Sequence, residues 1–240
     1  MKRIDEELEK FRIRTRLEGS LERGLGDISA ENQFESKKNN VFKILYDGKE
    51  CVAKVYSEEF ITRAENEFLI LQECKKRKVS APEPIELRKG AIIMTFVDGI
   101  RAYELLKKEP EKTLDQVANW LAEFHKSFDW KTCRGDCILK NFIIGEKTYG
   151  IDFEESFSGD PMYDIGQAIA HLLASDNKFS NERFSFARML AKSYFLYSEK
   201  KPDDISYYIA EGLRHYAKYR QDGEQLRAWA SNIEKKPFLF

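Results

Sequence analysis

Residues Arg134–Asn141 read RGDCILKN and residues Ile151–Glu154 read IDFE, and these two runs are the most informative part of the chain. Asp136 precedes Asn141 by five positions, and Asp152 follows a second apolar run. An aspartate can orient an attacking hydroxyl and accept its proton, while an asparagine and another aspartate can hold magnesium against a nucleotide's phosphates. The pattern therefore predicts phosphoryl transfer, with Asp136 as the catalytic residue and with Asn141 and Asp152 as magnesium ligands.

Outward from these runs, the chain changes from strand-rich to helix-rich near residue 98. Two β-rich runs, 41–45 and 50–56, are joined through Asp47-Gly48, which is a strong hairpin signal. A second hairpin is expected around Gly90. Apolar residues at helical spacing predict helices at 3–23, 60–76, 103–108, 113–128, 164–174, 182–197 and 205–220, the last extending to 229. We therefore expect an α+β protein.

The bulk composition excludes several classes of protein. Acidic and basic residues almost balance, 41 against 40, so the chain is not expected to attract nucleic acid by its net charge. No run of 18 apolar residues is present, and so no membrane span is predicted. The N-terminus lacks the apolar core of a signal peptide. The four cysteines fit buried thiols better than a zinc site, and we expect a cytoplasmic protein.

Lys54 and Glu67 form a second candidate pair. Lys54 lies inside a strand pattern, where a buried lysine is costly unless it has an anionic partner. Glu67 stands beside the apolar stripe of the next helix, which includes Phe68 and Leu71. Glu65 is the alternative partner, and it faces nearly the opposite way because a helix turns about 100° per residue. If neither glutamate pairs with it, Lys54 is an edge-strand lysine that reaches solvent.

These features resemble the protein-kinase-like superfamily in their order along the chain: strand lysine, helix glutamate, D-x-x-x-x-N, D-F-E, and Gly159–Asp164 (GDPMYD). The form is most similar to the aminoglycoside phosphotransferase and choline kinase branch, and the resemblance covers roughly residues 36–175. It implies a two-lobed fold. Residues 1–97 would form an N-terminal helix and a nucleotide-binding N-lobe with an antiparallel sheet, and residues 98–240 would form a mainly helical C-lobe with the catalytic and metal-binding loops.

The resemblance also implies cofactors, ATP (or GTP) and Mg²⁺, and places nucleotide contacts in the N-lobe. Lys54 would bind the α- and β-phosphates and pair with Glu67. Ser36 and Lys37 would meet phosphates where the family's glycine-rich loop is absent, a simple polar turn being the alternative. The hinge residues that would bond the purine through backbone groups are Thr95, Phe96 and Val97, although Phe96 suits the core equally well.

Two departures from the family pattern lie in the catalytic loop. The usual His-Gly-Asp is Arg134-Gly135-Asp136 here, and the arginine could brace the loop. Ile138 stands where protein kinases carry a phosphate-contacting lysine, so Lys140 would serve in catalysis instead, unless it is a solvated loop residue. Asp164 would accept backbone N–H bonds at a helix start and hold the loop.

The resemblance implies an ATP- and Mg²⁺-dependent phosphotransferase that acts on a hydroxyl of a small molecule. Only eleven residues separate Asp152 from Asp164, too few for a peptide-docking activation segment. The acidic residues Asp136, Glu154, Glu155 and Asp160 favour a cationic or polyhydroxylated acceptor. The alternatives are an atypical serine/threonine protein kinase, similar to the RIO or lipopolysaccharide-kinase-like groups, and a nucleotide-binding pseudokinase scaffold.

Overall fold

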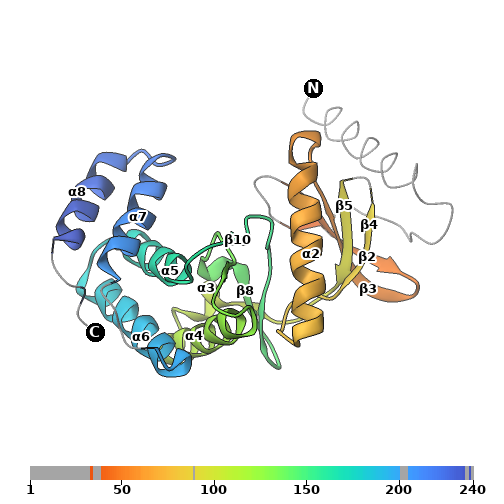
Figure 1. Cartoon of the computed structure of the whole chain (residues 1–240), viewed down its shortest axis with the longest axis horizontal. Helices are drawn as coiled ribbons and strands as arrows, with labels where there is room; N and C mark the ends of the chain where they lie inside the picture. The colour runs from red at the N-terminus through yellow and green to blue at the C-terminus, as the bar shows by residue number, and fades with distance from the viewer. Residues whose placement is uncertain (1–32, 35–38, 89, 201–204, 236–237, 239–240) are drawn as a thin grey trace. The chain divides into compact units, whose positions relative to one another are not determined.

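The computed structural model describes residues 33–34, 39–88, 90–200, 205–235 and 238 (Figure 1). The helix expected at 3–23 lies outside these residues. The chain separates into two compact units. The division is close to residue 98, except that the short segment 76–81 belongs to the second unit although it lies within the sequence of the first. The first unit contains residues 1–75 and 82–97, and the second contains residues 76–81 and 98–240.

The first unit is built on a five-stranded sheet with the strand order β1-β2-β3-β5-β4, and every pairing is antiparallel. The predicted Asp47-Gly48 hairpin is present, since Asp47 and Gly48 have φ values of 49° and 72°, as a tight two-residue turn requires. The strands are β1 (Gln33–Phe34), β2 (Asn40–Tyr46), β3 (Lys49–Val55), β4 (Pro84–Arg88) and β5 (Ala91–Thr95).

The sheet has two different faces because side chains alternate along each strand. One face carries a buried apolar cluster that includes Phe42, Ala53 and Ile93. Helix α2 (Ile61–Arg77) packs with the sheet (Figure 1) and buries Ala64, Glu67, Leu71 and Cys74, which recur at helical spacing. A glutamate in this apolar stripe needs a partner within the first unit.

The second unit is mainly helical. Its longest helices are α4 (Pro110–Ser127), α5 (Met162–Ala174), α6 (Asn181–Ser198), α7 (Ser206–Ala217) and α8 (Gly223–Glu234). The pattern expected to continue from 205 to 229 is therefore two helices, because the chain turns between Lys218 and Asp222. No helix in the described part of the chain is long and apolar enough to cross a membrane.

Short strands in the second unit frame the loops of the two decisive runs. Strands β6 (Ile100–Arg101), β8 (Phe142–Ile144) and β9 (Thr148–Gly150) form one small sheet, and β7 (Thr132–Cys133) pairs with β10 (Phe157–Ser158). The segment 134–141 follows β7, and the segment 151–156 follows β9. Helix α3 (Ala102–Leu105) lies beside β6 in sequence. The pairing of β7 with β10 places these two loops side by side.

Candidate active site

Lys54 and Glu67 form the predicted ion pair in the first unit. Lys54 Nζ lies 2.7 Å from Glu67 Oε2, and the two residues are 5% and 1% exposed. The Tyr56 hydroxyl also donates a hydrogen bond to Glu67, and burial together with that carboxylate raises the pKa of Tyr56. Glu65 is exposed, so the choice of Glu67 over Glu65 is confirmed. The role of the pair in nucleotide binding stays a prediction.

Glu67→Gln is expected to lower the free energy of unfolding by about 3–5 kcal/mol, because it removes the negative charge that Glu67 places 2.7 Å from the buried Lys54 ammonium. Glu65→Gln, the matched change on the exposed side of the same helix, should stay within about 0.5 kcal/mol of the wild type. Urea unfolding of both variants measures the difference. Equal losses of stability in the two variants would contradict the pairing.

The three predicted hinge residues differ in whether their backbone N–H groups already form hydrogen bonds within the protein. Thr95 and Phe96 use their N–H groups within the first unit, donating to Glu83 O at 2.9 Å and to Glu50 O at 3.4 Å. The Phe96 ring packs against other side chains, including that of Lys43, whose Nζ lies 4.2 Å from the ring centroid. Among the described residues, none accepts a backbone hydrogen bond from the Val97 N–H group. Of the three hinge residues, Val97 is thus the best candidate for a purine contact.

The phosphate-contacting turn predicted at Ser36 and Lys37 lies outside the described residues. Both residues belong to the segment 35–38. Their role therefore stays a prediction.

In the second unit, the Asp164 carboxylate holds the catalytic loop, as the sequence predicts. Arg134 N donates to Asp164 Oδ2 at 2.6 Å, and Gly135 N donates to Asp164 Oδ1 at 3.1 Å. The buried His125 bridges Asp164 and Tyr194 through its two ring nitrogens, each at 2.9 Å. Helix α5, which carries Asp164 in its first turn, and helix α4, which carries His125, thereby fix the start of the loop.

Arg134 braces the two loops against each other. Its side chain is 0% exposed, and its guanidinium donates to the Asp136 carbonyl at 3.0 Å and to the Ile151 carbonyl at 2.5 Å. The same group lies 5.0 Å from the ring centroid of Phe142 and 5.4 Å from that of Phe153. The arginine that departs from the family's histidine is therefore a structural link between the catalytic loop and the Asp152 loop.

Gly135 is required at its position between Arg134 and Asp136. Its φ is 66°, in the left-handed region that side chains disfavour. A Cβ atom at Gly135 would also collide with the carbonyl oxygen of Glu155. The loop can approach the 151–156 segment this closely only because residue 135 has no side chain.

Arg134→Lys is expected to lower the free energy of unfolding by about 2–3 kcal/mol, because an ammonium group cannot reach carbonyls on both loops and the Ile151 carbonyl then loses its bond from Arg134. The matched control is Arg188→Lys on an exposed part of α6, where no change beyond about 0.5 kcal/mol is expected. Thermal and urea unfolding check both variants. A stable Arg134→Lys protein would show that the guanidinium does not link the loops.

Asp136 and Asn141 are brought together as the spacing predicts. Asn141 Nδ2 donates to Asp136 Oδ2 at 3.1 Å and to Asp136 O at 3.0 Å, so the Asn141 Oδ1 atom is the one that could ligate a cation. Burial raises the pKa of Asp136, the Arg134 charge opposes that shift, and the nearby carboxylates of Asp152 and Glu155 add to it. A group of neighbouring carboxylates of this kind suits a divalent cation, because the cation offsets their mutual repulsion.

Asp152 adds a carboxylate beside this loop, held in an unusual backbone conformation with φ of 65°. Such strain persists only where the surrounding structure holds it, and it often marks a functional residue. The donor set of a carboxylate and an amide oxygen consists of the hard oxygen ligands that Mg²⁺ prefers. Asp152 and Asn141 therefore fit the predicted magnesium ligands in chemistry, and the assignment stays a prediction.

Lys140 is the second residue for which the sequence predicts a catalytic role, and that role stays a prediction. Its side chain is exposed, and its ammonium lies 5.3 Å from the ring centroid of Tyr103. Its backbone oxygen accepts a bond of 3.5 Å from Arg101. These contacts are those of a solvated loop lysine, the alternative that the sequence left open.

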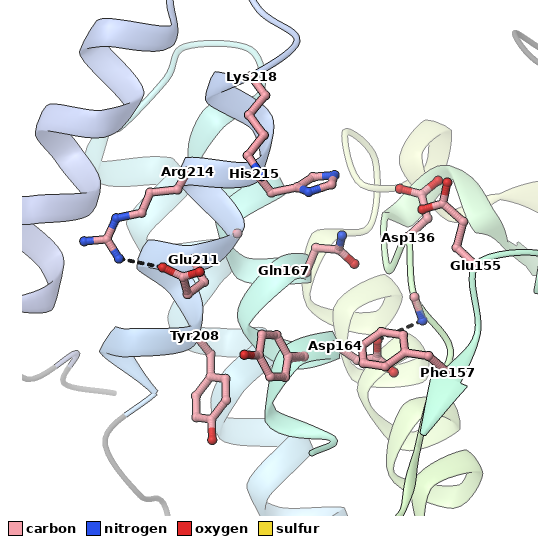
Figure 2. A pocket seen from close by; sticks show the side chains of 13 residues that line it. Asp136, Glu155, Phe157, Asp164, Gln167, Tyr208, Glu211, Arg214, His215 and Lys218 are labelled. Atoms are coloured by element: carbon pink, nitrogen blue, oxygen red, sulfur yellow. Dashed lines mark hydrogen bonds and ion pairs between the residues drawn. The ribbon is translucent and has the colours of Figure 1, made fainter. Parts of the chain in front are cut away.

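A pocket of about 370 Å³ opens beside Asp136 within the second unit (Figure 2). It is bounded by the catalytic loop, the segment after Asp152, and helices α5 and α7. The acidic residues Glu154 and Asp160, which the sequence placed near the site, do not line it. The lining residues are Gly135, Asp136, Glu155, Phe157, Tyr163, Asp164, Gln167, Tyr208, Glu211, Gly212, Arg214, His215 and Lys218.

Sequence reasoning found only part of this pocket. The α7 residues that it missed are Glu211, Gly212, Arg214 and His215, because the run 206–217 has the pattern of an ordinary amphipathic helix and carries no motif. Gln167 could have been suggested by the sequence, because it lies shortly after the GDPMYD motif. In the structure, Gln167 Oε1 accepts a hydrogen bond of 2.7 Å from Cys137 N. The lining is mixed in charge, and charge alone therefore no longer favours a cationic acceptor.

Comparisons with known proteins agree with this architecture. A family model described as the RIO domain matches residues 32–158, which is more than half of the 240 residues. No curated protein matches the sequence. The protein-kinase-like superfamily predicted from the sequence is thus confirmed. Among the groups of this superfamily that the sequence suggested, the RIO domain is the one whose family model matches.

Three solved structures have a similar fold. A candidate aminoglycoside phosphotransferase from Ralstonia eutropha is 14% identical, with a TM-score of 0.60, over 92% of this chain and 94% of that one. A choline/ethanolamine kinase family protein from Mesorhizobium loti is 15% identical, with a TM-score of 0.63, over 88% and 89%. The protein chain in the structure of the streptomycin–ATP–APH(2")-IIa ternary complex is 15% identical, with a TM-score of 0.58, over 95% of this chain and 98% of that one. At these identities the likeness shows a kinase-like phosphotransferase fold.

Proposed function

The chain belongs to the RIO domain family, and we propose that it transfers the γ-phosphoryl group of ATP, with Mg²⁺, to a hydroxyl of a small molecule. The observation that carries the proposal is the pocket of about 370 Å³ beside Asp136. Its size lies in the range of small-molecule sites. Its position puts a bound hydroxyl within reach of the carboxylate that the D-x-x-x-x-N spacing marks as catalytic.

Asp136 orients the acceptor hydroxyl and takes its proton as the oxygen attacks. A bond forms between that oxygen and the γ-phosphorus, the bond from the γ-phosphorus to the bridging oxygen breaks, and ADP leaves with a phosphomonoester as the other product. Magnesium, when bound, neutralises charge on the phosphates. Asn141 and Asp152 would hold the ion, and Lys54, positioned by Glu67, would bind the nucleotide's α- and β-phosphates.

The buried supports around Asp136 fit this role. Arg134 and Asp164 hold the loop through bonds of 2.5 to 3.1 Å to the backbone, and the Asp136 carboxylate itself accepts a bond of 3.1 Å from Asn141 Nδ2 at its Oδ2 atom. Positioning of this kind supplies most of the rate enhancement in phosphoryl transfer, because the protein contributes little covalent chemistry.

The test is transfer from labelled ATP, with Mg²⁺ and with EDTA, to a panel of amino sugars, amino alcohols, polyols, hydroxy acids, sugar phosphates and generic protein substrates. Magnesium-dependent labelling of at least one small molecule is expected. Labelling of proteins alone would defeat the proposal.

The second candidate is an atypical serine/threonine protein kinase, and the match to the RIO domain model is the observation that favours it. Robust labelling of protein substrates, with no small molecule accepted, would establish it. A chain that binds nucleotide without any transfer would instead be the pseudokinase scaffold.

A further inference from the structure

The pocket beside Asp136 has two chemically different ends. Asp136 and Glu155 stand on the side of the catalytic loop, whereas Arg214, His215 and Lys218 come from the last turn of α7 and the residue after it. In Figure 2 the His215 imidazole extends from α7 toward Asp136 and Glu155. The pocket therefore joins an acidic end, where the hydroxyl would react, to a basic end.

The basic groups of α7 are not equally available to a ligand. Arg214 Nη1 lies 2.7 Å from Glu211 Oε1, and the same guanidinium also pairs with Glu234 on α8. Its charge is therefore neutralised within the protein, and Figure 2 shows it pointing away from Asp136. Within the described part of the chain, Lys218 and His215 form no ion pair with a carboxylate.

We propose, on the basis of the phosphotransferase function above, that the acceptor carries an anionic group, a carboxylate or a phosphate, which Lys218 and His215 bind at the α7 end of the pocket. The hydroxyl of the same molecule lies at Asp136. An ammonium and an imidazole can both donate charge-assisted hydrogen bonds to such an anion. The two ends then impose a direction on the acceptor, because the reverse orientation would place its anion against Asp136 and Glu155.

The remaining lining suits the body of such a molecule. Tyr163 and Tyr208 pack edge to face with ring centroids 5.1 Å apart, and Tyr208 is fixed further because its hydroxyl donates to Asp160 Oδ2 at 2.6 Å. Gln167 adds a neutral polar group between the two ends (Figure 2). Rigid tyrosines and an amide accommodate a short polyhydroxylated chain without adding net charge.

Lysine and histidine at the end of a helix also stabilise its dipole. That role predicts a change in stability and no change in the choice of acceptor. An experiment that compares acceptors therefore separates the two explanations.

The experiment measures kcat/KM for glycerol, glycerate and glycerol 3-phosphate with the wild-type chain, Lys218→Glu and the control Lys192→Glu, which makes the same charge change on an exposed part of α6. The wild type is expected to prefer the two anions to glycerol. Lys218→Glu should lower kcat/KM for the anions by about tenfold or more, which is what one charge-assisted bond contributes, and leave glycerol within about twofold. Lys192→Glu should change neither. The two anionic arms distinguish a carboxylate from a phosphate.

Calorimetric titration of glycerol 3-phosphate into each variant adds a readout that does not depend on turnover. Binding that is lost in Lys218→Glu and kept in Lys192→Glu supports the anion site even if no transfer occurs, in which case the proposed function alone fails. Transfer that is equally fast for glycerol and the anions, unaffected by Lys218→Glu, overturns the anion site and leaves the proposed function standing. Absence of both binding and transfer to all three acceptors overturns the inference.

Discussion

Asp136→Asn is expected to reduce phosphoryl transfer by about 10²–10⁴-fold, the range typical of a positioned general base, while ATP affinity stays within a few-fold of the wild type. The amide cannot accept the hydroxyl proton, but it has the shape of the carboxylate. Asparagine also tolerates the positive φ of 22° at this position, so the loop should keep its backbone. Single-turnover transfer and equilibrium nucleotide binding should be measured on the same preparation.

The matched control for this variant is Asp129→Asn, which makes the same change at another aspartate of positive φ, 55°, and at an exposed site outside the pocket. Its transfer rate should equal that of the wild type. Survival of transfer in Asp136→Asn, with collapse of ATP affinity, would move Asp136 from the acceptor to the nucleotide.

Asp152→Asn is expected to lower magnesium-dependent nucleotide affinity by about 100-fold or more, since a metal ligand that loses its charge forfeits several kcal/mol of interaction with the ion. Asparagine is preferable to alanine here because the φ of 65° suits asparagine and would strain alanine. A loss of affinity in Asp152→Asn then reports on the metal rather than on the backbone.

The control is Asp47→Asn in the β2–β3 turn, where φ is 49° and asparagine is equally acceptable. Nucleotide binding should be titrated with Mg²⁺ and with EDTA for each variant. Asp152→Asn should abolish the difference between the two conditions, and Asp47→Asn should retain it. An undiminished magnesium effect in Asp152→Asn would remove Asp152 from the metal site.

Local sequence patterns determined much of this protein. The Asp47-Gly48 hairpin, the helix that carries Glu67, and the D-x-x-x-x-N loop all depend on residues close together in the chain, where spacing decides geometry. The choice of Glu67 over Glu65 also followed from periodicity, because only one of two positions on opposite sides of a helix can face the sheet. The family resemblance added the order of these parts, and the match to the RIO domain model agrees with that order.

Tertiary structure decided what the residues do once they meet. The sequence suggested that Arg134 could brace its own loop, but its guanidinium also reaches a second loop, at Ile151, which is 17 residues away along the chain. No local pattern reports such a link. The sequence places Lys140 beside Asn141, and only the structure shows that the Lys140 side chain lies over Tyr103. A loop residue's side-chain direction depends on the packing around the loop, which spacing does not encode.

The pocket beside Asp136 combines residues that a local sequence pattern predicts with residues that only the folded chain brings together. The sequence predicted Asp136, Asn141 and Asp152 as site residues, because a phosphotransferase of this superfamily requires those groups at that spacing. Only the folded chain brings His215 and Lys218 to the far end of the pocket. They lie about 80 residues from Asp136 in the sequence, and no sequence motif contains both parts. A loop motif is recognisable in the sequence because its residues are close together in the chain, whereas the lining of this pocket depends on helices that pack together only in the tertiary structure.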